Sequence, residues 1–142
     1  MKSTATARWN PAKKEGTIST ALGALKDTAY SVAGRFQGAP TGTTPEELIA
    51  AAHAGCFSMA FAGGLGRAGI NAQSIETTAT VEIVPQQTGS PNITESVLKS
   101  RVVAPGADAA KVREIAEAEK KHCPVSKALA SVKISLDLDI KT

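Results

Sequence analysis

Apolar and polar residues alternate in several segments of this chain, and this pattern predicts a protein rich in strands. The strictest alternation covers the C-terminal segment 132–140, where Val, Ile and Leu occupy every second position. Five further segments are β-prone and bounded by turn residues, and strands are expected over 4–9, 16–22, 30–36, 74–84 and 93–104. The first three should form a meander, and the last two a hairpin.

Two helical regions interrupt these strands. Thr44 and Glu47 have the spacing of a capping box, with Pro45 at the first helical position, so a helix is expected to begin there and to run to about 66–69. Asp108 is expected to cap a second helix after a Pro-Gly break. The predicted order is βββ-α-ββ-α-β, an α+β fold in which sheet covers helix.

Length and composition indicate one domain spanning residues 1–142, with 42% apolar and 20% charged residues, typical of a soluble globular protein. The net charge is +3, but the basic residues are scattered, which argues against a nucleic-acid surface. The N-terminal residues lack the apolar segment of a secretory signal, so a cytoplasmic location is expected.

The segment from Leu48 to Gly66 has no charged residue and is long enough to span a bilayer. It consists mostly of Ala and Gly, however, and contains His53 and Ser58. Such a helix gains little from lipid but packs closely against protein. We therefore expect no membrane span, and interpret the segment as the buried central helix of the domain or of a dimer.

The chain has two cysteines, and the first, Cys56, lies inside this Ala-rich helix. By itself this is the pattern of a small hydrophobic residue in a core. A reactive thiol must ionise, and Cys56 is too far from the helix start for the helix dipole to help. A cation from elsewhere is then required. Arg35 is the best candidate, because Gly34 permits close approach; the alternative is that Arg35 is an exposed charge at a strand end.

The second cysteine, Cys123, precedes Pro124 and is expected at the N-cap of a helix. There its sulfur would face backbone N–H groups that favour the thiolate, and Lys120 and Lys121 would add positive potential. Ser, Thr, Asp and Asn are better caps than Cys. The position therefore indicates a functional thiol rather than a packing residue.

Glu46 lies in the first turn of the cysteine helix, where a carboxylate complements the helix dipole and is also available to orient an arginine. Ten residues separate Glu46 from Cys56, roughly 15 Å of helical rise. The two cannot share one arginine along an unbroken helix. Either Gly55 marks a break, or Glu46 reaches its partner in another subunit.

Two other motifs carry less weight. The glycines of 64–69 match the dinucleotide-binding pattern, but they end a helix instead of following a strand and opening one. His53 and His122, together with the cysteines, lack the spacing of a zinc site. We expect neither a metal nor another cofactor.

Taken together, the segments 45–57 (PEELIAAAHAGCF) and 122–126 (HCPVS) resemble the family of osmotically inducible proteins and organic hydroperoxide resistance proteins, which are thiol peroxidases. The segment 24–27 (ALKD) with the later 35–36 (RF) is similar to the osmotically inducible branch. The resemblance covers essentially the whole chain.

This resemblance implies an intertwined homodimer, in which antiparallel sheets from both chains wrap two central helices and the active sites lie at the interface. It further implies that Cys56 is the peroxidatic cysteine, Cys123 the resolving one, Arg35 the activating cation and Glu46 its partner. The expected reaction is the reduction of organic hydroperoxides, and less well of hydrogen peroxide, through a Cys56 sulfenic acid and a Cys56–Cys123 disulfide that a lipoyl-type dithiol recycles. The alternative is a non-enzymatic module of the same fold, which binds a small ligand and uses its cysteines for packing.

Overall fold

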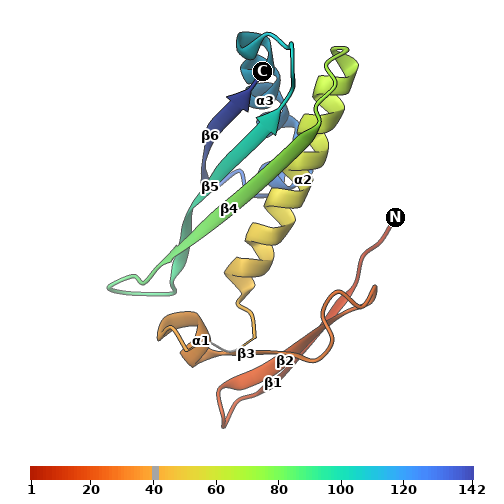
Figure 1. The fold of residues 1–142 in the computed structure, drawn as a ribbon. Coiled ribbons are helices and arrows are strands. Elements are labelled where there is room, and N and C mark those ends of the chain that lie inside the picture. The colour runs from red at the N-terminus through yellow and green to blue at the C-terminus, as the bar shows by residue number, and fades with distance from the viewer. Residues whose placement is uncertain (40–41) are drawn as a thin grey trace. The chain divides into compact units, whose positions relative to one another are not determined.

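The structure is a computed structural model that describes residues 1–39 and 42–142 (Figure 1). Its elements are β1 (Ala5–Asn10), β2 (Glu15–Thr20), β3 (Thr28–Ser31), α1 (Val32–Phe36), α2 (Pro45–Arg67), β4 (Ser74–Val84), β5 (Asn92–Val103), α3 (Ala109–His122), α4 (Pro124–Ala128) and β6 (Lys133–Lys141). The predicted α+β order is confirmed. The short helix α1 is added to it, and the second helical region consists of α3 and of α4, the helix expected after Cys123. The chain divides into two compact units, Met1–Leu48 and Ile49–Thr142, which we describe separately.

The first unit is built on a three-stranded antiparallel sheet in the order β1-β2-β3, which confirms the predicted meander. Ala5 pairs with Thr20 at one end of the β1–β2 ladder, and Asn10 pairs with Glu15 at the turn. The side-chain oxygen of Asn10 accepts hydrogen bonds from the backbone N–H groups of Ala12 and Lys13, at 3.1 and 3.2 Å, and so shapes that turn.

The prediction of one strand over residues 30–36 is wrong in its second half. β3 ends at Ser31, and Val32–Phe36 form the helix α1. The Ser31 hydroxyl accepts a hydrogen bond from the Gly34 N–H at 2.9 Å, which is the geometry of an N-cap. Arg35 therefore lies on a helical turn and not at a strand end.

α2 begins at Pro45, as the capping pattern predicts. The Glu47 N–H donates to the Thr44 hydroxyl at 3.1 Å. The Glu47 carboxylate, by contrast, accepts from the Thr43 hydroxyl at 2.6 Å, so only half of the predicted capping box forms as expected. α2 is one continuous helix to Arg67, so the suggestion of a break at Gly55 is wrong.

The second unit holds a three-stranded sheet in the order β4-β5-β6. β4 and β5 form the predicted antiparallel hairpin, whereas β6 pairs with β5 in the parallel direction. The expectation of purely antiparallel sheets is therefore wrong. The reason is the connection: α3 and α4 lie between β5 and β6, and a helical crossover of this kind lets the next strand run parallel.

The core of this second unit lies where α2 and α3 pack with the sheet (Figure 1). Its fully buried side chains come from α2, β5, α3 and the start of α4, and include Phe57, Phe61, Leu65, Leu98, Val102, Val112, Ala116 and Cys123. Val112 and Ala116 bring α3 into this core. Each of its large apolar side chains contributes roughly 1.5–3 kcal/mol by burial.

α2 and α3 approach each other closely at Gly64. A Cβ atom there would stand 2.7 Å from the Cγ of Glu119 and 2.8 Å from Cγ2 of Ile115. An ion pair between Arg67 and Glu119 also joins the two helices. This glycine therefore serves helix packing, which agrees with rejecting a dinucleotide-binding loop.

α2 is long and apolar enough to cross a membrane by length and composition, a test that core helices also pass. Within the single chain, 28% of its most apolar window is buried. Phe57 and Phe61 lie fully inside, whereas Met59 is 78% exposed. One face of α2 is thus covered by its own unit, and the other presents small and apolar side chains.

Candidate active site

The two cysteines lie together in the second unit. Cys56 belongs to α2, Cys123 is the N-cap residue of α4, and their sulfur atoms are 2.9 Å apart. Both are free thiols; Cys123 is fully buried and Cys56 is partly exposed. Residues 67 positions apart in sequence are thus brought to a distance from which a disulfide needs only a short approach.

The environments of the two thiols differ. Burial opposes ionisation of Cys123, but the Cys56 thiol, the N–H and hydroxyl groups of Ser126 and the Val125 N–H favour its thiolate and together lower its pKa. Burial raises the pKa of Cys56, and its hydrogen bond with Cys123 raises it further, against the smaller effect of the Val125 N–H. Within one chain, these effects favour the thiolate at Cys123 over the thiolate at Cys56.

The expected position of Cys123 at a helix start is confirmed, with Pro124 following it. Its sulfur does not have the geometry of a capping hydrogen bond, although the N–H groups after it favour the thiolate. Lys120, expected to add positive potential, forms an ion pair with Glu117 at 2.6 Å.

Arg35 and Glu46 form the second pair, in the first unit. Nη2 of Arg35 lies 2.5 Å from Oε1 of Glu46, and Nε lies 3.0 and 3.2 Å from the two carboxylate oxygens. The Glu46 side chain is only 8% exposed, so this is a largely desolvated, charge-assisted interaction. The guanidinium also lies over the ring of Phe36, 5.0 Å from its centroid.

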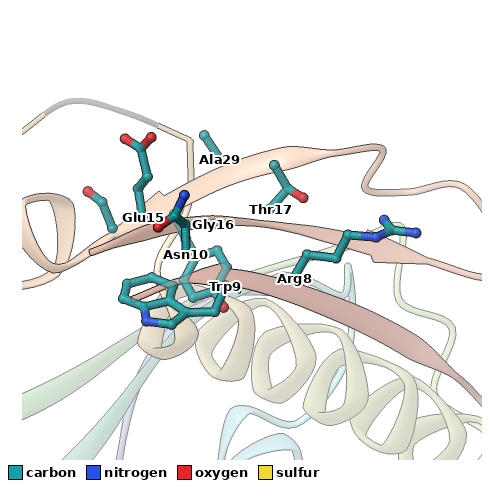
Figure 2. Close-up of a pocket in the computed structure, with 9 residues that line it drawn as sticks. Arg8, Trp9, Asn10, Glu15, Gly16, Thr17 and Ala29 are labelled. Atoms are coloured by element: carbon teal, nitrogen blue, oxygen red, sulfur yellow. The ribbon is translucent and has the colours of Figure 1, made fainter. Parts of the chain in front are cut away.

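Hollows also lie in the first unit, and Arg35 lines one of them. One hollow, of about 530 Å³, is lined by residues of β1, β2 and β3, among them Trp9. Figure 2 shows the residues that line it. The ring of Trp9 packs against that of Tyr30, with their centroids 5.1 Å apart. A smaller hollow of about 220 Å³ shares these two rings and is also lined by Arg35 and Phe36. It combines aromatic walls with one cation.

Sequence reasoning missed a hydrogen-bonded chain behind the cysteines. His53 is fully buried; its Nδ1 lies 2.7 Å from the Ser96 hydroxyl and its Nε2 lies 2.9 Å from the Ser126 hydroxyl. Burial lowers the pKa of His53, so its ring is neutral. The spacing offered a signal, because His53 precedes Cys56 by three residues and Ser126 follows Cys123 by three.

Within residues 1–39 and 42–142, the structure contains no group of three or more His, Cys, Asp or Glu side chains that could hold a metal ion. The chemistry that the cysteine pair itself supports is thiol–disulfide chemistry, since two thiols in contact can exchange two electrons by forming one bond.

Comparisons with known proteins agree with this geometry. The family model described as OsmC-like protein matches residues 38–137. Peroxiredoxin OsmC of Escherichia coli (strain K12) is 45% identical over 128 residues, which is 90% of this chain and 87% of that protein. The organic hydroperoxide resistance protein OhrB of Bacillus subtilis is 27% identical with a TM-score of 0.77, covering 98% of both chains.

An organic hydroperoxide resistance protein from Elizabethkingia anophelis has the same fold, with a TM-score of 0.78, 24% identity and coverage of 100% of this chain and 96% of that one. The matched segment 38–137 contains both cysteines and Glu46, and the structural likeness extends over nearly the whole chain. This chain therefore belongs to the OsmC-like protein family.

Proposed function

We propose that this protein is a cysteine-based peroxidase that reduces organic hydroperoxides, with Cys56 as the peroxidatic cysteine and Cys123 as the resolving one. The observation that carries the proposal is the contact of two free thiols, 2.9 Å apart, on two different helices. The 45% identity to a peroxiredoxin over most of the chain makes it a peroxiredoxin-like enzyme. The relatives named for organic hydroperoxide resistance support the substrate class.

The reaction has three steps. The Cys56 thiolate attacks one oxygen of the hydroperoxide, the O–O bond breaks, and an alcohol leaves after protonation, so that Cys56 becomes a sulfenic acid. Cys123 then attacks the sulfenic sulfur; the S–S bond forms, the S–O bond breaks, and the hydroxide leaves as water with the Cys123 proton. An external dithiol, which the family resemblance suggests to be of lipoyl type, reduces the disulfide and is itself oxidised.

The first step needs a cation near Cys56, because burial and Cys123 raise its pKa within one chain. Arg35 is the proposed cation, held in orientation by Glu46. Glu46 and Cys56 are ten residues apart on the continuous helix α2, roughly 15 Å of rise. We therefore propose that Arg35 of a second copy activates Cys56, which makes the homodimer part of the active site.

The surface of α2 supports such a dimer. From Leu48 to Gly66 it has no charged residue, and Met59 is 78% exposed in the single chain. A second copy of the same helix would cover this apolar face, and a self-complementary patch is what a two-fold interface requires. We propose a cytoplasmic homodimer that contacts neither membrane nor nucleic acid.

The hollow beside Arg35 supports an organic substrate. The rings of Trp9, Tyr30 and Phe36 give it apolar walls, and the cation would face the peroxide oxygens. Phe57 is fully buried in the core and Met59 faces outward, so neither is the proposed wall.

The direct test is anaerobic. The protein is fully reduced, one equivalent of cumene hydroperoxide is added, and the thiols are counted alongside the intact mass. We expect both thiols to disappear with a loss of about two mass units, and a dithiol to restore them. The variant Cys56→Ser should consume no peroxide. Two unreacted thiols in the wild type would instead favour the alternative, a non-enzymatic module that binds a small ligand and uses its cysteines for packing.

A further inference from the structure

We propose that His53 is a positioning residue for the resolving step, in which it acts through the hydroxyl of Ser126 on Cys123. The inference rests on the proposed function, since it assigns a role within that cycle. His53 does not contact either sulfur itself. It fixes the Ser126 hydroxyl, which acts on Cys123.

The geometry joins three elements. His53 lies on α2, Ser96 on β5 and Ser126 in the first turn of α4, and all three side chains are buried. The two ring nitrogens lie 2.7 and 2.9 Å from the two hydroxyl oxygens. The hydroxyl of Ser126 is in turn one of the groups that favour the thiolate of Cys123 and lower its pKa. These contacts form a hydrogen-bonded chain that runs from Ser96 through His53 and Ser126 to the resolving thiol.

The hydrogen bonds of this chain can all point toward the sulfur. A neutral imidazole has one N–H and one acceptor nitrogen. If Nδ1 accepts the Ser96 hydroxyl proton, Nε2–H donates to the Ser126 oxygen, and the Ser126 proton is then free to donate to Cys123. This tautomer keeps every buried polar atom satisfied and supplies one donor to the thiolate.

That donor matters because the nucleophile of the resolving step is the thiolate. A thiolate in a fully buried site is costly unless donors replace its lost water. The Ser126 hydroxyl can rotate. In the hydrogen-bonded chain, His53 is the group that fixes the hydroxyl proton toward the sulfur. His53 therefore keeps Cys123 in the form that attacks the sulfenic acid.

A second hydroxyl chain in the same unit offers a comparison. Ser58, Thr77 and Ser100 connect α2, β4 and β5 through hydrogen bonds of 2.9 and 3.0 Å. Ser100 is buried like Ser96, with 3% exposed against 0%, and lies four residues from it on β5. The variant Ser100→Ala therefore removes a buried hydroxyl of the same kind and serves as the matched control.

The test separates the two chemical steps. Reduced protein is mixed with cumene hydroperoxide, peroxide loss reports sulfenic acid formation, and quenched samples report disulfide formation by mass. We expect His53→Phe and Ser126→Ala to form the disulfide about tenfold more slowly, the factor for losing one hydrogen bond to a charged group. A sulfenic acid trap should capture more Cys56 in both variants. Ser100→Ala should match the wild type.

Two further readouts distinguish positioning from mere packing. In a Cys56→Ser background, the ultraviolet absorbance of the Cys123 thiolate is followed against pH; His53→Phe should move its midpoint upward. His53→Gln, whose amide N–H can still reach Ser126, should recover most of the resolving rate. The double variant His53→Phe/Ser126→Ala should form the disulfide no more slowly than the slower single variant, because both residues belong to the same hydrogen-bonded chain.

The outcomes are distinct. If the wild type forms the disulfide and His53→Phe forms it at the same rate, the role of His53 is overturned while the proposed function stands. An unchanged thiolate midpoint overturns it as well. Wild type that keeps both thiols overturns the proposed function, while the thiolate midpoint still tests the hydrogen-bonded chain. If His53→Phe does not fold, the comparison of Ser126→Ala with Ser100→Ala decides.

Discussion

The guanidinium of Arg35 is held by the carboxylate of Glu46 through both its Nη2 and Nε groups, at 2.5 and 3.0 Å from the same oxygen. Arg35 lies in α1 and Glu46 in the first turn of α2, so the pair fixes the guanidinium plane from a neighbouring element. A carboxylate that is 8% exposed orients the cation strongly, and a fixed cation is what a peroxidatic thiolate requires.

Replacing Arg35 should therefore disable peroxide reduction without unfolding the protein. In Arg35→Ala we expect the pKa of Cys56 to stay high and peroxide turnover with a dithiol to fall by at least about tenfold, because the thiolate loses its cation. Arg8→Ala is the control, since Arg8 forms an exposed ion pair with Asp27. Unchanged turnover in Arg35→Ala would show that Arg35 takes no part in peroxide reduction.

Mixed dimers test whether Arg35 acts across the interface. Neither Arg35→Ala nor Cys56→Ser should turn over peroxide well alone. When the two variants are co-expressed, half of the randomly paired dimers are mixed and have one complete site, so roughly a quarter of the wild-type rate should return. Failure to recover activity in mixed dimers of proven composition would place the arginine and the thiol in one chain.

The resolving role of Cys123 makes a separate prediction. Cys123→Ser should still consume about one equivalent of peroxide per Cys56, because the first step needs only the peroxidatic thiol. The sulfenic acid should then persist, and no intramolecular disulfide should appear in the intact mass. If this variant cycles with a dithiol as fast as the wild type, Cys123 is not the resolving thiol.

The parts of the site that sequence could predict depend on local signals. Cys123 before Pro124 and the start of α2 at Pro45 are both set by neighbouring residues, and both are found where expected. The chain through His53 was not predictable in this way. Its partners Ser96 and Ser126 lie 43 and 73 residues away, and only the packing of α2, β5 and α4 brings them together.

The difference between local signals and long-range packing also explains where the predicted fold is wrong. Period-two alternation identifies β6 but is the same for parallel and antiparallel pairing, so the direction of β6 relative to β5 had to come from the structure. The pattern predicts a strand over the residues of α1 because five residues are too few to show helical periodicity. The N-cap at Ser31 starts the helix instead. The long helix and the β4–β5 hairpin carry enough pattern to be predicted closely.

His53 should make the protein less stable in mild acid. Burial lowers its pKa in the folded state, whereas the unfolded chain has the ordinary value of about 6.5. Above that pH the ring is neutral in both states. Below it, the unfolded chain binds a proton that the folded chain refuses, so the free energy of unfolding falls by up to about 1.4 kcal/mol per pH unit.

Urea unfolding between about pH 5 and 8, at one protein concentration, measures this dependence. His53→Gln should remove this part of the acid sensitivity, because its amide does not titrate. His122→Gln, at the exposed other histidine of the chain, is measured in parallel as a histidine replacement outside the buried chain of His53. Equal slopes for His53→Gln and the wild type would mean that His53 does not titrate differently in the two states.

Two glycines on one helix should respond oppositely to the same substitution. A Cβ at Gly64 would lie 2.7 and 2.8 Å from atoms of Glu119 and Ile115, and the branched Ile115 side chain is stiff. Gly64→Ala should therefore cost roughly 1–3 kcal/mol by overpacking. At Gly66, two residues later, a Cβ meets nothing within 4 Å, and Ala should gain up to about 1 kcal/mol of helix stability. Urea midpoints with unchanged slopes measure both effects, and equal midpoints would show that α3 yields to the added methyl group.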